Sequence, residues 1–345
     1  MDTVQMKKTY GYKPLSYKLI PLFRSGAPDF AAAEELIRCG ADVNDQGDDK
    51  GQNVLSEILE GYWRSCAADM ALEGCWDCHE DYEWCRGCPK SLNPDAGAAM
   101  LEVIRFFLSH GFDVNHNEGR HGAQCMYSLY LSTFDNRMIP ALKLLLDAGA
   151  KNIPIEDDPY YTPIEAFHEE QSFQDTSEHN HYLGNVYEAA YRILAAVDAG
   201  RPYSDIETFE TAVGKKILYV MADGKAGVPV FTSVDTETSK HDNCFYCNLY
   251  LIYDGGFLVC EKEAFYYVDA HLPDIPLVDV SDRFPLLIGQ TINQISFDHH
   301  EIAKERIHYG QPRTTLHLSN GVKMTFTINF GEADRDHYCA YYYYS

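Results

Sequence analysis

The residues with the clearest chemical potential are four cysteines in one short segment. They form two successive Cys-x-x-Cys pairs, whose members are Cys75, Cys78, Cys85 and Cys88. Four thiolates at this spacing can bind one tetrahedral Zn²⁺. Because sulfur would fill every position, no position stays open for a substrate, and we expect a structural zinc that stabilises a segment lacking its own core.

Three other interpretations use the same thiolates. Reduced cysteines in a surface loop can simply fill small apolar gaps, and an iron–sulfur cluster also takes four thiolates. The substring Cys75 to His79 matches the attachment motif of c-type haem, which requires export. The polar N-terminus, Met1 to Ser16, is not typical of a secretory signal, so we favour zinc and expect a cytoplasmic protein.

A second, weaker metal candidate is Cys244 with Cys247. A strand would place these two thiols on opposite faces, so an ordinary core or surface cysteine is the favoured interpretation. Further scattered polar candidates are His241, Asp242, Cys260, Asp298, His299, His300, Glu301, His179 and His181. None has a spacing such as His-Glu-x-x-His, and no phosphate-binding loop or Gly-x-Ser-x-Gly motif is present, so we assign no catalytic residue.

The composition limits the possible partners. The 345 residues include 52 acidic and 28 basic side chains, which gives a formal charge of −24. Such a surface repels phosphate backbones and anionic membranes, so we expect no direct nucleic-acid or membrane binding. Mean hydropathy is −0.32, and no apolar run approaches the roughly 20 residues that cross a bilayer. The charge suits a basic protein partner, although many proteins are acidic only for solubility.

The length predicts about two domains, and the residue pattern changes near position 205. Before that point, amphipathic helical segments repeatedly end in a glycine and a short polar turn. Examples are Ala33–Asn44, Leu101–Asn115 and Ala141–Ala150, with a weaker copy at Ala189–Gly200. Glycine is the residue that a left-handed helix cap prefers, so these are predicted helix ends.

These segments resemble the second helix and following loop of ankyrin repeats over about residues 17–203. Tyr161–Ala166 is similar to the Thr-Pro-Leu-His-x-Ala start of such a repeat through Thr162 and Pro163, with Ile164 and Glu165 in place of Leu and His. The resemblance implies an α-solenoid that binds proteins and has no catalytic residues. The spacing exceeds the roughly 33 residues of a regular array, which predicts insertions at the cysteine-rich 61–95 and around 169–181.

After residue 205 the pattern favours strands. Residues 248–260 and 315–328 both read as hairpins, with turns at Asp254–Gly256 and Asn320–Gly321. Each is preceded by a similar segment, Val213–Ile217 or Ile288–Ile292. We therefore predict a β-rich region, 206–345, built from two similar units at 206–275 and 283–345.

The predicted protein is thus an α+β multidomain chain with an ankyrin-type solenoid at 1–205 and a β-rich domain at 206–345. Three functions are compatible with it. The first is a non-enzymatic interaction protein that binds a basic partner, with a weaker resemblance to ankyrin-type bacterial immunity and inhibitor proteins. The second is an enzyme or small-ligand sensor in the β-rich region, targeted by the repeats. The third is an acidic inhibitor that mimics DNA.

Overall fold

The chain is mixed α and β, with helices in its N-terminal half and two antiparallel sheets after them. The computed structural model describes residues 15–23, 28–45, 52–60, 94–132, 136–155, 161–172, 178–223, 231–232, 244–245, 247–260, 266–271, 275–300, 311–329 and 339–344. Its contacts divide the chain into two compact units, Met1–Glu169 and Glu170–Ser345. Each unit has its own arrangement.

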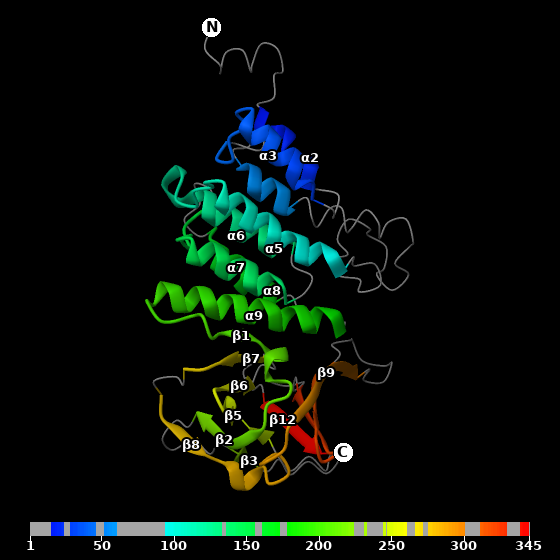
Figure 1. Ribbon diagram of the computed structural model, residues 1–345. Coiled ribbons are helices and arrows are strands. Elements are labelled where there is room, and N and C mark those ends of the chain that lie inside the picture. Colours follow the sequence, from blue (N-terminus) through cyan, green and yellow to red (C-terminus); the bar gives the residue numbers. More distant parts are fainter. Residues whose placement is uncertain are drawn as a thin grey trace, which may run out of the picture. The chain divides into compact units, whose positions relative to one another are not determined.

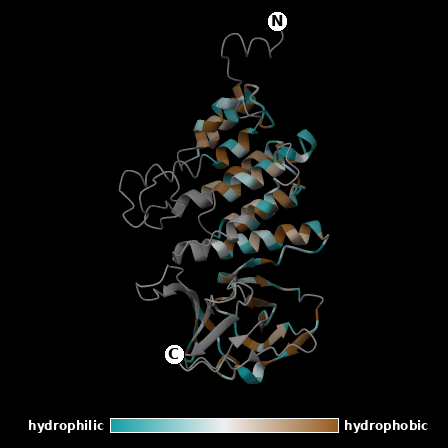
Figure 2. Cartoon of the chain, turned by 180° about the vertical axis from the view of Figure 1, so that it is seen from behind, coloured by the Kyte–Doolittle hydropathy of each residue, from teal (hydrophilic) through white to brown (hydrophobic). Residues whose placement is uncertain are grey.

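The first unit consists of short helices that lie in successive layers (Figure 1). Its elements are η1 (Leu15–Lys18), α2 (Ile20–Phe23), α3 (Phe30–Arg38), a helical stretch at 54–60, α5 (Pro94–Ser109), η2 (Asn117–Gly119), α6 (Arg120–Ser132), α7 (Met138–Asp147) and the start of α8 (Pro163–Ser172). Apolar and polar residues alternate along these helices (Figure 2), as expected where one face is buried.

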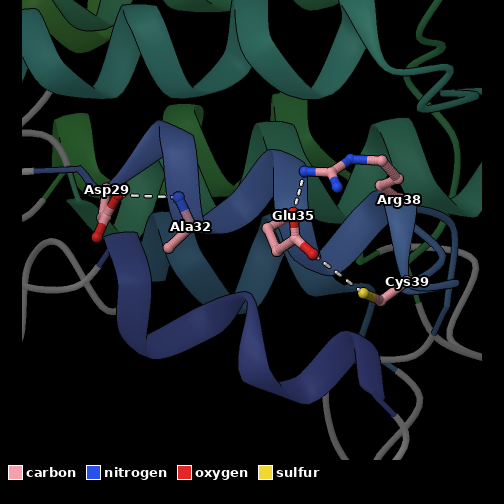
Figure 3. A network of polar contacts seen from close by, with 5 residues as sticks. All are labelled: Asp29, Ala32, Glu35, Arg38 and Cys39. Atoms are coloured by element: carbon pink, nitrogen blue, oxygen red, sulfur yellow. Dashed lines mark hydrogen bonds and ion pairs between the residues drawn. The ribbon is translucent and has the colours of Figure 1, made fainter.

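Helix α3 shows how the sequence fixes a helix locally. The Asp29 carboxylate accepts a hydrogen bond from the Ala32 backbone N–H at 2.9 Å and so caps the first turn (Figure 3). One turn later, Glu35 pairs with Arg38 and accepts a contact from the Cys39 thiol at 3.5 Å. These groups are exposed, so they define where the helix begins and ends without contributing to the core.

The predicted glycine caps are confirmed at all four helix ends. Gly40, Gly111, Gly149 and Gly200 have φ angles of 99°, 85°, 97° and 64°. The same pair of backbone bonds recurs at each; at the first, Gly40 N donates to Ile37 O and Ala41 N to Leu36 O, both at 2.9 Å. This is the Schellman pattern, which directs the chain sharply away from the helix axis.

An aromatic cluster joins the first helices of this unit. The ring of Phe23 lies 5.5 Å from that of Phe107 and 5.7 Å from that of Phe106, while Phe30 lies 5.3 Å from Phe106. Phe23 and Phe107 are fully buried. Tilted and edge-on contacts at these distances are the favoured geometry of aromatic rings, so α2, α3 and α5 share one core.

The second unit begins with α9 (Glu178–Asp198) and continues into two six-stranded antiparallel sheets. The first has the order β1 (Glu207–Thr208), β7 (Tyr266–Asp269), β6 (Gly256–Cys260), β5 (Leu249–Tyr253), β2 (Ile217–Asp223) and β8 (Leu277–Asp279). The second has the order β3 (Phe231–Thr232), β4 (Cys244–Phe245), β12 (Cys339–Tyr344), β11 (Lys323–Asn329), β10 (Gln311–Leu318) and β9 (Ile292–His300). One continuous core contains buried residues of both sheets, including Leu251 and Leu316.

Both predicted hairpins are confirmed. Strands β5 and β6 pair in register from Leu249↔Cys260 to Tyr253↔Gly256, and β10 pairs with β11 from Arg313↔Thr327 to His317↔Lys323. Gly255 and Gly321 occupy the turns with φ of 88° and 82°. Only glycine adopts such angles without strain, so these two residues set the turns and hence the registers.

The two segments that precede the hairpins pair with each other. Gly214 N donates to Ile292 O at 2.7 Å, and Gly289 N donates to Ile217 O at 2.8 Å. Lys216 and Thr291 form the antiparallel bridge between them. The two segments therefore exchange equivalent backbone hydrogen bonds. This is the pattern expected of a local two-fold axis through the bridge.

Three details differ from the predicted organisation. Strands β3 and β4 come from the first predicted β unit but belong to the second sheet. The expected linker after residue 275 forms β8 and a short helix, η4 (Ser281–Arg283). Helix α9 belongs to the same compact unit as the strands, because it packs on β7, β1 and β9, whereas the predicted boundary at 205/206 follows the change in residue pattern.

Candidate interaction surface

The loops after the capped helices of the first unit are joined by side-chain hydrogen bonds. Asn44, in the loop after α3, donates through Nδ2 to Gly111 O at 3.0 Å and accepts the Asp113 backbone N–H at 2.7 Å. In the next capped loop, Asn115 lies beside Gly149. A Cβ atom placed on Gly149 would be 3.3 Å from Asn115 Nδ2. In these two loops an asparagine thus lies beside the next capping glycine along the chain.

The outer side of these loops is acidic. Asp42, Asp113 and Glu118 are exposed, whereas the residues between them, Val43 and Phe112, are buried. The Asp42 and Asp113 carboxylates accept the backbone N–H of the residue two positions on, each at 2.9 Å. These bonds hold the loop backbone in place and leave the charge available at the surface.

A buried polar network lies beneath the loops. Asn53 is fully buried; its Nδ2 donates to His121 O at 3.1 Å and to Gln124 Oε1 at 2.9 Å, and its Oδ1 accepts the Ser56 backbone N–H. Asn53 therefore caps the helical stretch at 54–60 and at the same time ties it to α6. Buried polar groups of this kind are costly unless they are hydrogen-bonded, so the network fixes the order in which these helices meet.

His121, at the start of α6, is the most unusual group in this layer. It is 3% exposed, its ring stacks on Phe112 at 5.9 Å, and the His116 ring lies 4.7 Å away. Its Nδ1 has no hydrogen-bond partner among the described residues. Burial, reinforced by His116, lowers the pKa of His121 to about 4 against the opposing pull of Asp113 and Asp42, so the ring is neutral at neutral pH.

A serine and a histidine meet on the second sheet. Ser296 Oγ of β9 lies 2.8 Å from His317 Nε2 of β10, and both side chains are half-buried. Desolvation, followed by the charge of Lys323, lowers the pKa of His317. The sequence analysis missed this pair because the two residues are distant in the chain; the strand registers bring them together.

The predicted metal ligands cannot be placed. Cys75, Cys78, Cys85 and Cys88 lie outside the described residues, as do His241, Asp242 and Glu301. Asp298, His299 and His300 lie in β9, and His179 and His181 lie in α9, but their side chains are not described. Within the ranges that the structure describes, no three His, Cys, Asp or Glu side chains gather in a way that could hold a metal ion.

Two cysteines of the β-rich region, Cys247 and Cys260, belong to the core. Cys247 and Cys260 are 6% and 1% exposed and lie in the core shared by the two sheets. Burial raises the pKa of the Cys247 thiol to about 12 and also raises that of Cys260. Cys247 is therefore a core cysteine, one of the two ordinary roles expected of it, and Cys260 lies in the same core; neither thiol is a nucleophile at neutral pH.

Comparisons with known proteins provide no further assignment. No family model, curated protein or solved structure matches this chain. In the part of the chain that the structure describes, no helix is both long and apolar enough to span a bilayer.

Proposed function

We propose that residues 1–205 form an ankyrin-type module that binds a basic protein partner, and that the chain acts as an inhibitor or immunity-type protein in the cytoplasm. One observation carries this proposal. The loops after successive helices have the same caps, are linked through Asn44, and present Asp42 and Asp113 to solvent. Loops held on a rigid scaffold are a common place for partner contacts.

The charge supports the choice of partner. The chain carries a formal charge of −24, so a basic protein would approach it faster than a neutral one would. Arg38 and Arg105 are the basic groups paired on helices α3 and α5, and each is neutralised by a glutamate one turn away. The loop carboxylates bind backbone N–H groups, which leaves their negative charge for the partner.

The test begins with affinity capture of the tagged full chain from its native lysate. A stoichiometric basic protein should be identified by mass spectrometry, and its association rate should then be measured with purified components. Replacing Asp42 and Asp113 together by Asn keeps the oxygens that accept the loop N–H groups but removes two charges. We expect this variant to associate roughly 3–10-fold more slowly at low salt and to lose its salt dependence in part.

A matched control removes the same charge elsewhere. Glu34 and Glu102 are exposed on helices α3 and α5, and replacing both by Gln should change the association rate less than about two-fold. Equal effects of the two double variants would mean that only net charge matters and would overturn the loop surface. Competition by duplex DNA for the captured partner would favour the DNA-mimic alternative.

We further propose that Cys75, Cys78, Cys85 and Cys88 hold one structural zinc ion. Two closely spaced Cys-x-x-Cys pairs supply a complete tetrahedral ligand set. Elemental analysis of the purified full chain should find about one zinc per chain, and Cys85→Ser should lose it. Cys39→Ser is the control, because this exposed cysteine is remote in sequence from the pairs. Metal-free folded protein, or iron instead of zinc, would contradict the proposal.

We also propose that the β-rich region arose by duplication of one unit. Strands β2, β5, β6 and β7 run in the same consecutive antiparallel order as β9, β10, β11 and β12. The reciprocal bonds of Gly214 and Gly289 support this origin, because equivalent residues make equivalent bonds. The predictions for Phe209 and Phe284 given below test it.

A further inference from the structure

We propose that Ser296 and His317 are the nucleophile and general base of a site that cleaves carboxylic esters on the face of the second sheet that points away from the shared core. Serine attacks acyl carbons when a neutral histidine accepts its proton, and the contact must join Ser Oγ to a ring nitrogen. Here Oγ and Nε2 are 2.8 Å apart. The inference concerns the β-rich region alone and is independent of protein binding by the helical module.

The strand registers place the two groups on a polar face. One cross-strand row of β9, β10 and β11 faces the core. It consists of Ile295, Leu316 and Met324, which belong to the core or pack against it. Side chains alternate along a strand, so the residues on either side of this row point the other way. Ser296 and His317 are among them, which is consistent with their partial exposure.

The neighbours of His317 can stabilise developing negative charge. Gln294 of β9 and Lys323 of β11 are directly opposite His317 on the two adjacent strands, and both are exposed. Directly opposed residues have Cβ atoms about 4.5–5.5 Å apart. An ammonium and a carboxamide are donors suited to the oxyanion that forms when serine attacks an ester.

Two buried threonines lie beside Ser296 in the same cross-strand row. Thr315 and Thr325 are 8% and 4% exposed, and their hydroxyls are 2.9 Å apart in the row next to His317. Ser296 is directly opposite Thr315. The nucleophile therefore lies beside a closed polar contact, and the register of β9 with β10, which shifts only after His317, sets its distance from the base.

The reaction follows from these positions. Ser296 Oγ forms a bond to the acyl carbon while its proton passes to His317 Nε2. The bond from the acyl carbon to the leaving oxygen then breaks, and that oxygen takes the proton from His317 and departs as an alcohol. Water attacks the acyl-serine by the same route, giving the free acid and restoring both side chains.

The experiment uses the full chain and a fluorophosphonate probe, which reacts with activated serines. Oγ attacks phosphorus, fluoride leaves, and peptide mass spectrometry locates the adduct. We expect one adduct at Ser296 that Ser296→Ala abolishes and Ser319→Ala leaves unchanged. Ser319 is the matched control, because it is an exposed serine whose hydroxyl contacts Gln290 and the Thr291 N–H instead of a histidine.

Two further variants separate catalysis from structure. His317→Gln keeps a polar group in place but removes the base, so labelling should slow roughly 100-fold or more. The wild-type labelling rate should rise with pH, and the midpoint of this rise should lie below the pKa of an ordinary histidine, because desolvation and then Lys323 lower the pKa of His317. Lys323→Gln should move that midpoint to higher pH, since it removes a neighbouring positive charge. A folded protein without an adduct at Ser296, or one labelled equally fast in His317→Gln, overturns the proposal.

Discussion

The two halves of the molecule use repeated sequence in opposite ways. In the helical region, the loop after the first glycine-capped helix end is hydrogen-bonded onward to the next capped end, as Asn44 contacts Gly111. In the β-rich region, the two similar segments turn toward each other, and Gly214 and Gly289 exchange equivalent bonds. The helical loops keep an exposed outer side, whereas the two segments of the β-rich region bury the surface that they share. Exposed partner contacts are therefore expected on the helical half.

Substitution of two phenylalanines tests whether the two paired segments of the β-rich region have equivalent roles. Phe209 and Phe284 each precede one of the paired segments, and they are 2% and 0% exposed in the same core. If the two halves are equivalent, Phe209→Ala and Phe284→Ala should each lower the free energy of unfolding by about 3–5 kcal/mol. Urea denaturation measures both. Losses that differ by more than about 2 kcal/mol would argue against equivalent roles.

Acid should weaken the helical half through His121. The pKa of this group is about 4 in the folded protein and 6.5 when unperturbed, so the unfolded chain binds more protons between these values. Stability is therefore complete above pH 6.5 and falls toward pH 4, by up to about 3 kcal/mol. Unfolding measured across this window should show the slope, and His121→Gln should lack it. An identical slope in both proteins would exclude His121 as its source.

Two helical ion pairs of similar sequence spacing should contribute differently to the free energy of unfolding in the two regions. Glu188 in α9 is 2% exposed and pairs with Arg192, which also lies over the ring of Tyr267 on β7. Glu188→Ala leaves a partly buried guanidinium without this carboxylate and should cost about 2–3 kcal/mol. Glu102→Ala removes the exposed pair with Arg105 and should cost less than about 0.5 kcal/mol. Thermal melts of the two variants give the comparison.

The contact between the helical loops should contribute less to stability than the buried pair of Glu188 with Arg192. Asn44→Ala removes one hydrogen bond to Gly111 and one from Asp113, both at partly solvated positions. We expect a loss of about 1–2 kcal/mol and faster hydrogen exchange of the Asp113 amide. Unchanged exchange at Asp113 would show that the loops do not depend on one another.

Local signals in the sequence predicted the parts of the fold that depend on local geometry. Gly40 and Gly255 could be placed in turns because their backbone angles exclude most other residues. The pairing of 213–217 with 288–292 was not predicted, since alternation of residue type identifies a strand but not its partner. For the same reason the contact between Ser296 and His317 was missed, because it arises from the register of β9 with β10. The cysteine pairs could be recognised because their ligand spacing is itself local.

The bridge between Lys216 and Thr291 also has a consequence for synthesis on the ribosome. The backbone N–H of Ile217 donates to the carbonyl of Gln290, which is translated much later. Until the chain has grown past Ile292, the segment before β2 lacks its backbone pairing partner, and the first strands of the β-rich region lack part of their core. Contacts this distant in sequence form slowly. The contacts within the helical layers are nearer in sequence. These layers should therefore fold during synthesis before the sheets are complete.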